Sequence, residues 1–305
     1  MTSLTLRTCA KVNFCLRVLG RRTDGYHNVE TVLQAVGLWD EARLTLLPGE
    51  PRLTLDVDSP DVPVGEANLC WRAASLLAQR ARASSGVAIS LHKSIPVGAG
   101  LGGGSSDAAA VLLGLVRLWG LSLPDDDMAD LANQLGADVS FFLHGGCCLA
   151  QGRGEDLKPL PHLPAWLVVV VPEKRMTTAQ AYAALRRGAA RGHRRLLTRP
   201  LQRTIKALQA GSLPALASSL HNDFEAAPMA GIDEARRATA DLLAAGCLGA
   251  SLSGSGSGAF GLAPDQAAAE AAASHLRASW PWVRVAPSLP PGAGLQFLAD
   301  TEVAS

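Results

Sequence analysis

A glycine-rich segment between an expected strand and an expected helix is the feature of this sequence best suited to chemistry. Residues 96–107 read PVGAGLGGGSSD, and five of the seven residues 98–104 are glycine. Glycine allows a backbone to adopt positive φ and to approach a ligand closely. The N–H groups at the start of the following helix, together with the helix dipole, favour an anion. The segment therefore predicts a phosphate site, formed by Pro96, Val97, Gly98, Ala99, Gly100, Leu101, Gly102, Gly103, Gly104, Ser105 and Ser106.

Two common nucleotide-binding loops do not fit this segment. A Walker A loop ends in glycine, lysine and serine or threonine, whereas residues 103–106 read GGSS. A dinucleotide fingerprint can be placed on residues 98–103, but no βαβ unit opens the chain and no acidic residue follows at a strand end about 20 residues on. A flexible linker is also disfavoured, because the segment separates a clear strand from a clear amphipathic helix.

The elements that must position this segment can be read from the spacing of apolar residues. Alternation predicts a strand over residues 4–18, with Lys11 and Asn13 projecting from the same side. Further strands are expected over residues 42–47 and 53–57, paired as a hairpin or meander, and over 87–92. Apolar residues at helical spacing predict helices over residues 68–82, behind the glycine segment as far as Gly120, and over 124–135. Residues 105–107 are of types suited to a helix start.

The second half of the chain predicts alternating strands and helices. A buried strand over residues 167–171 follows a proline-rich stretch, so we place a domain boundary between residues 161 and 162. A strand, a glycine loop at residues 253–258, a strand, a helix and a last strand over 282–286 complete the expected order. The alternation favours a layered α/β sandwich. Read alone, the 253–258 loop fits a linker and a binding loop equally well.

Composition narrows the class of protein. The 305 residues have a formal net charge of +1, which gives no bulk reason to expect nucleic acid or a membrane as a partner. The first twelve residues lack the apolar core of a signal peptide, and the six cysteines lack metal-ligand spacing. We expect a cytoplasmic protein with reduced thiols. The arginine-rich stretch 189–199 is interpreted as a solvated face, with a phosphate-attracting rim or an RNA contact as alternatives.

The glycine segment resembles the second motif of the GHMP kinase superfamily, which includes galactokinase and homoserine, mevalonate and phosphomevalonate kinases. Residues 252–256 (LSGSG) resemble the third motif of that superfamily. The resemblance implies an ATP-dependent kinase with Mg²⁺ and a small-molecule acceptor. It also implies an α+β fold of two domains, an N-terminal ATP-binding domain over residues 1–161 and a C-terminal ferredoxin-like α/β sandwich over 162–305, with the active site in the cleft.

Three further segments narrow the resemblance to one family within the superfamily. Residues 10–16 (AKVNFCL), 22–27 (RTDGYH) and 136–142 (GADVSFF) are similar to segments of kinases that act on cytidine diphosphate methylerythritol, in the non-mevalonate route to isoprenoids. Ser140 stands where that family usually has proline.

The resemblance implies roles for individual residues. Asp138 is the expected base for the acceptor hydroxyl, and Lys11 beside it would keep the aspartate ionised and orient the hydroxyl. Tyr26 and His27 are expected to hold the cytosine, and Tyr182 to close the other side of the base. Asn13 is expected to hydrogen-bond the substrate.

Three alternatives remain open at this point. The chain could phosphorylate homoserine or mevalonate, or it could be a nucleotide-binding regulator without catalysis. An RNA-binding role through the arginine-rich stretch is the third. The sequence leaves the magnesium ligands undetermined, as it does the choice between monomer and homodimer.

Overall fold

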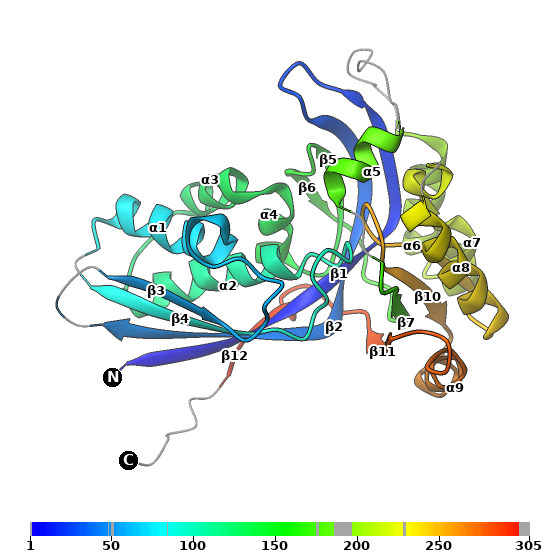
Figure 1. Cartoon of the computed structure of the whole chain (residues 1–305). Coiled ribbons are helices and arrows are strands. Elements are labelled where there is room, and N and C mark those ends of the chain that lie inside the picture. Colours follow the sequence, from blue (N-terminus) through cyan, green and yellow to red (C-terminus); the bar gives the residue numbers. More distant parts are fainter. Residues whose placement is uncertain are drawn as a thin grey trace.

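The computed structural model describes residues 2–47, 49, 52–83, 85–174, 177–185, 197–227 and 230–298. Within these residues the chain forms two β-sheets with helices packed on them, which confirms the expected α+β class (Figure 1). Of the arginine-rich stretch 189–199, residues 189–196 lie outside the described residues.

The larger sheet is built on two long antiparallel strands, β1 and β2. Its main path runs β12-β1-β2-β4-β3, while β5 and β6 extend from β2 and β8 pairs with β1. The strands are β1 (Ser3–Arg21), β2 (His27–Leu47), β3 (Leu53–Val57), β4 (Gly86–His92), β5 (Cys147–Gly152), β6 (Asp156–Pro159), β8 (His221–Asn222) and β12 (Leu295–Leu298).

Helices from the first half of the chain pack against this sheet, either directly or on the helices that contact it. They are η1 (Gly65–Ala67), α1 (Leu69–Ala81), α2 (Gly103–Leu118), α3 (Asp125–Leu135) and α4 (Ala137–His144). Asn68 begins α1 by accepting a hydrogen bond from the N–H of Cys70. The approach of α2 to the sheet is close, because a Cβ at Gly114 would lie 2.4 Å from a methyl carbon of Leu44. The helix that follows the glycine segment is therefore fixed against the sheet.

The smaller sheet has the strand order β11-β7-β10-β9, and every pair in it is antiparallel. With its helices this is the βαββαβ order of a ferredoxin-like sandwich, as expected. The strands are β7 (Trp166–Val171), β9 (Gly249–Leu252), β10 (Ala259–Ala263) and β11 (Trp282–Pro287). The helices of this half are α5 (Thr178–Leu185), α6 (Arg199–Gln209), α7 (Leu213–Ser219), η2 (Asp223–Ala226), α8 (Ala230–Ala244) and α9 (Gln266–Leu276).

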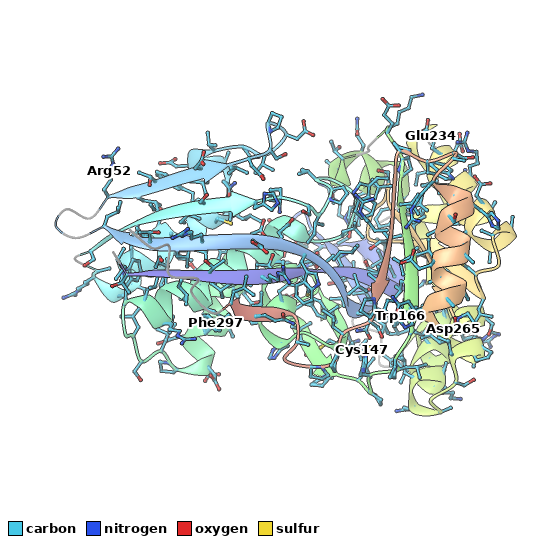
Figure 2. The ribbon with its side chains drawn as sticks, turned by 90° about the horizontal axis from the view of Figure 1, so that it is seen from below. Arg52, Cys147, Trp166, Glu234, Asp265 and Phe297 are labelled. Atoms are coloured by element: carbon cyan, nitrogen blue, oxygen red, sulfur yellow. The ribbon has the colours of Figure 1, made fainter. Side chains whose placement is uncertain are left out.

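The two sheets are joined through strand β7, whose side chains alternate between two cores. Leu167 and Val169 pack with residues of β1 and β2 such as Phe14, whereas Val168 and Val170 pack with α8 and α9. Figure 1 shows β1 and β2 extending past β3 and β4 toward the second half of the chain. Seen from below, Phe297 lies at the larger sheet, while Trp166 and Asp265 lie at the other end of the molecule (Figure 2).

Two expectations about strand order are wrong. Strand β3 does not form a hairpin with β2; it pairs in parallel with β4, which itself pairs with β2. The reason is that α1 connects β3 to β4 as a crossover, so β3 reaches the far edge of the sheet. Strand β11 is not the last strand, because β12 follows it and pairs with β1. The boundary after residue 161 stays a prediction.

The cysteines agree with the expectation of free thiols. All six are buried and unpaired. None of the helices in the described part of the chain is both long enough and apolar enough to span a membrane.

Candidate active site

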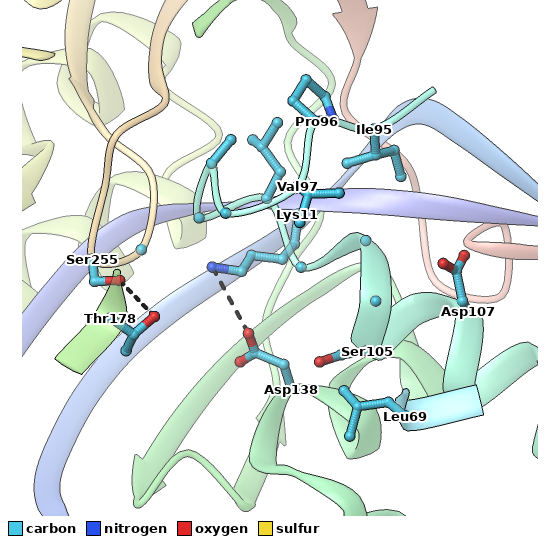
Figure 3. A pocket seen from close by; sticks show the side chains of 18 of the residues that line it. Lys11, Leu69, Ile95, Pro96, Val97, Ser105, Asp107, Asp138, Thr178 and Ser255 are labelled. Atoms are coloured by element: carbon cyan, nitrogen blue, oxygen red, sulfur yellow. Dashed lines mark hydrogen bonds and ion pairs between the residues drawn. The ribbon is translucent and has the colours of Figure 1, made fainter. Parts of the chain in front are cut away.

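The glycine segment lines a cavity of about 470 Å³ between the two halves of the molecule. Residues 96–105 all contribute to its wall, whereas Ser106 is buried behind it. Lys11, Asn13, Asp138 and Tyr182 also line this cavity, as Figure 3 shows for Lys11 and Asp138. The structure thus brings most of the expected site residues together, although Tyr26 and His27 are not part of the wall.

The glycine segment leads directly into α2. Gly102, with φ of +76°, caps the helix, and its carbonyl accepts hydrogen bonds from the N–H groups of Ser105 and Ser106, each at 3.0 Å. The expected cap at residues 105–107 is therefore displaced, because these residues lie inside the first turns of the helix. A Cβ at Gly102 would lie 2.8 Å from the Phe142 ring, so only glycine fits this contact.

Lys11 lies on β1 under the glycine segment, and its side chain is only 4 % exposed. Its Nζ donates to Oδ1 of Asn13 at 2.8 Å and lies 4.0 Å from Oδ2 of Asp138. Burial lowers the pKa of Lys11, and the charge of Asp138 opposes that shift. The ammonium group is thus fixed between a neutral acceptor and a carboxylate.

Asn13 is held by the protein on both sides of its amide. Its Oδ1 accepts from Lys11 and from the N–H of Gly254 at 2.8 Å, and its Nδ2 donates to Oγ1 of Thr31 at 2.8 Å. Both lone pairs of the carbonyl oxygen are then used, and one amide hydrogen is left for a ligand. These hydrogen bonds suit Asn13 mainly to orient the Lys11 ammonium group, and one amide hydrogen remains for the substrate.

Asp138 occupies the first turn of α4, with Gly136 at the N-cap. Its side chain is 42 % exposed and faces the cavity toward Lys11 (Figure 3). A carboxylate that is reachable from the cavity can accept a proton from a bound hydroxyl group.

The loop at residues 253–258, whose role the sequence leaves open, packs directly on the glycine segment. Oγ of Ser253 donates to the carbonyl of Gly100 at 2.9 Å, and the N–H of Gly258 donates to the carbonyl of Ala99 at 3.1 Å. A Cβ at Gly100 would lie 2.0 Å from the Ser253 carbonyl oxygen. The two glycine-rich loops therefore interlock, and the second also holds Asn13 through Gly254.

Aromatic residues gather beside the cavity, around Tyr182 on its wall. The rings of His27 and Tyr182 are in contact at 4.8 Å between centroids, and Tyr182 meets Phe224 edge-on at 4.9 Å. Tyr26 is 59 % exposed, and the guanidinium carbon of Arg153 lies 5.3 Å from its ring centre. Partial burial lowers the pKa of His27, and Arg21 adds to the shift.

Arg153 is a cavity residue that the sequence did not indicate. It lies just after β5, lines the cavity, and holds its guanidinium group beside the ring of Tyr26. A single arginine in a turn carries no sequence signal, so only the fold could place it there.

Family models match both halves of the chain. GHMP kinases N terminal domain matches residues 68–146, and GHMP kinases C terminal matches residues 204–281. Among solved structures, a crystal structure of 4-(cytidine 5'-diphospho)-2C-methyl-D-erythritol kinase has a TM-score of 0.76 and 38 % identity, covering 93 % of this chain and 98 % of that one. A homoserine kinase from Cytophaga hutchinsonii has a TM-score of 0.74 at 19 % identity and covers 98 % of both chains. At that identity the second likeness concerns the fold alone.

Curated relatives are similar over almost the whole chain. The 4-diphosphocytidyl-2-C-methyl-D-erythritol kinase of Geobacter sulfurreducens is 40 % identical over 282 residues, covering 92 % of this chain and 97 % of the relative. The enzyme of that name from Symbiobacterium thermophilum is 43 % identical over 261 residues, covering 85 % of this chain and 90 % of the relative. Together with the site geometry, these matches show that the chain belongs to the 4-diphosphocytidyl-2-C-methyl-D-erythritol kinase family of the GHMP kinases.

Proposed function

We propose that this chain transfers the γ-phosphoryl group of ATP to the 2-hydroxyl of 4-diphosphocytidyl-2-C-methyl-D-erythritol, giving ADP and the 2-phosphate in the non-mevalonate route to isoprenoid precursors. The observation that carries the proposal is the meeting of three features in one cavity: a glycine segment at a helix start, a buried lysine, and an exposed aspartate 4.0 Å from it. The family relationship supports the identity of the acceptor.

The donor end of the cavity is the glycine segment. The backbone of residues 98–104 and the start of the 16-residue helix α2 offer N–H groups and a positive dipole end to the phosphates of ATP. Phosphoryl transfer requires positioning and charge stabilisation more than covalent chemistry by the protein.

The acceptor hydroxyl lies, in this proposal, between Asp138 and Lys11. The hydroxyl is tertiary and weakly acidic, so a carboxylate that accepts its proton assists attack on the γ-phosphorus. Lys11, held by Asn13, directs its remaining N–H groups at the hydroxyl and the transferred phosphoryl oxygens. Because burial lowers the pKa of Lys11, its charge is sustained by the Asp138 carboxylate, and the two groups act as a pair.

Magnesium fits this cavity as a partner of the nucleotide. The described residues contain no group of three or more histidine, cysteine, aspartate or glutamate side chains that could hold a metal ion. Mg²⁺ needs few protein ligands when phosphates and water supply most of its oxygens. The hydroxyl of Ser105, on the cavity wall (Figure 3), is an oxygen donor that would hold it. The ion would neutralise charge on the phosphates.

The cytidine end of the acceptor is assigned to the aromatic group. Tyr26 offers an exposed ring face, and Tyr182 offers a ring on the cavity wall. The rings of His27 and Tyr182 are in contact, so the pyrimidine ring either stacks next to this pair or inserts between the two rings. Arg153 lines the same cavity, and its guanidinium carbon lies 5.3 Å from the ring centre of Tyr26, which suits it to the diphosphate of the acceptor.

The experiment that tests the function is a substrate panel. ADP release from MgATP is measured with the cytidine diphosphate acceptor, homoserine and mevalonate, and ³¹P NMR identifies the product. Turnover restricted to the cytidine acceptor, with a new phosphate monoester, is the expected result. Turnover on homoserine or mevalonate would refute the acceptor assignment, and ATP binding without any turnover would point to a regulator.

A further inference from the structure

Behind the glycine segment lies a buried cluster of charges that the proposed chemistry does not use. Nζ of Lys93 contacts one carboxylate oxygen of Asp40 and one of Asp107. The side chains of all three residues are at most 5 % exposed. They come from three elements, since Asp40 lies on β2, Lys93 follows β4, and Asp107 lies in α2.

The remaining oxygens of both aspartates are also used. Oδ1 of Asp40 accepts the backbone N–H groups of Ser94 and Ile95 at 2.6 and 2.7 Å. Oδ1 of Asp107 accepts the hydroxyl of Thr8 on β1 at 2.8 Å. The cluster therefore fixes the backbone just before the glycine segment and the helix just after it.

The charged cluster also lies against the glycine segment itself. A Cβ at Gly103 would lie 3.1 Å from Oδ2 of Asp40 and 3.0 Å from a methyl carbon of Ile95. Both Lys93 and Asp107 also reach the wall of the cavity. Figure 3 shows Asp107 and Ile95 on the side of the cavity away from Ser255 and Thr178.

The charges of the cluster do not suit a direct contact with phosphate. One ammonium group between two carboxylates offers no excess positive charge to an anion. Burial raises the pKa of Asp107 to about 6; Lys93 opposes this shift and Asp40 adds to it. Burial alone would lower the pKa of Lys93, but the two carboxylates outweigh it and raise that pKa. A buried charge cluster is also a poor source of stability compared with apolar packing, so its value lies in fixing geometry.

We propose that Lys93, Asp40 and Asp107 form a charged latch that holds both ends of the glycine segment and thereby positions its N–H groups for the phosphates of the donor nucleotide. Lys93 and the two aspartates are positioning residues for the donor and not for the acceptor. This inference rests on the proposed ATP site.

The decisive variant is Asp40→Asn, because an amide has a single acceptor oxygen and cannot serve both the two backbone N–H groups and the Lys93 ammonium. The latch predicts that KM for MgATP rises about tenfold, the change that corresponds to one lost hydrogen-bonded contact, while KM for the acceptor stays within about twofold. If Lys93 instead bound phosphate directly, Asp40→Asn would release its charge and lower KM for MgATP. An unchanged or lowered value overturns the proposal.

A matched control is Asp223→Asn. Asp223 is likewise buried, accepts the N–H of Val18 at 2.9 Å, and pairs with Arg17 at 3.2 Å. It is not part of the cavity wall. We expect this variant to lower the melting temperature without changing the ratio of the two KM values.

If Asp40→Asn does not fold, a second variant in which all three charged residues are replaced by uncharged ones provides the test. The triple variant Asp40→Asn, Lys93→Met, Asp107→Asn leaves no unpaired buried charge but removes the latch. Circular dichroism should show that this variant is folded, and its KM for MgATP should still be raised. A KM for MgATP equal to that of the wild type would overturn the proposal.

Binding of a fluorescent ATP analogue separates this inference from the proposed function. Absence of binding to the wild-type chain would refute the proposed function. Equal affinity of wild type and Asp40→Asn for the analogue would refute the latch alone.

Discussion

The interlock of the two glycine-rich loops can be tested by adding one carbon atom. In Gly100→Ala the new Cβ would lie 2.0 Å from the Ser253 carbonyl oxygen, about 1 Å closer than real Cβ contacts allow, at a backbone φ of +75°. The left-handed conformation costs about 1–2 kcal/mol for alanine, and forced separation of packed segments costs about 1–3 kcal/mol. The expected loss of unfolding free energy is therefore roughly 2–5 kcal/mol.

Gly211→Ala isolates the conformational part of this cost. Gly211 has a similar φ of +61°, and a Cβ there meets nothing within 4 Å. It lies between α6 and α7, away from the cavity. Its substitution should cost about 1–2 kcal/mol and leave turnover unchanged.

The assay is urea denaturation of both variants, combined with kcat and both KM values. The Gly100→Ala variant should lose more stability than Gly211→Ala and should also lose turnover, since the 253–258 loop holds Asn13 and, through it, Lys11. Equal stability losses in the two variants, with turnover intact, would refute the interlock.

Three other residues carry further predictions. Burial raises the pKa of Asp107 from 3.8 to about 6, so between these pH values the folded chain holds a proton that the unfolded chain releases, and the free energy of unfolding falls as pH rises. Replacing the carboxyl in Asp107→Asn should therefore make the free energy of unfolding less dependent on pH between about pH 4 and 6. An unchanged slope in this variant would contradict the raised pKa. Tyr182→Ala should raise KM for the cytidine acceptor roughly 5- to 100-fold, the value of one ring stack, with Tyr182→Phe near wild type; equal KM values for all three chains would exclude stacking. Arg153→Met should raise KM for the acceptor and not for MgATP, with Arg153→Lys intermediate, and a change confined to the ATP constant would place the arginine at the donor instead.

Local patterns were enough to predict most of the elements and part of the site. The two-residue period of a strand placed Lys11 and Asn13 on one side of β1, and the structure confirms this through their hydrogen bond. The glycine segment lies, as predicted, between a strand and a helix. Helix α2 ends as expected before Gly120, which has a φ of +59°.

Features that depend on distant partners could not be read from the sequence. The pairing of β3 with β4 depends on the crossover through α1, and the short connection from β2 favoured a hairpin instead. Asp107 has the residue type of a helix cap, but Lys93 and Thr8 hold its side chain elsewhere. The packing of the 253–258 loop on the glycine segment joins parts of the chain about 150 residues apart, which no local pattern encodes.

The most direct test of the account is the rate of ADP release with MgATP and the cytidine diphosphate acceptor for wild type and Asp138→Asn. The amide keeps the size of the side chain but cannot accept the proton from the hydroxyl, so kcat should fall about 10²- to 10⁴-fold while KM for MgATP changes little. Asp156→Asn, at a carboxylate 57 % exposed on β6 outside the cavity, is the matched control and should turn over like wild type. If Asp138→Asn instead retains kcat within a few-fold of wild type, Asp138 is not the base and the proposed mechanism is wrong.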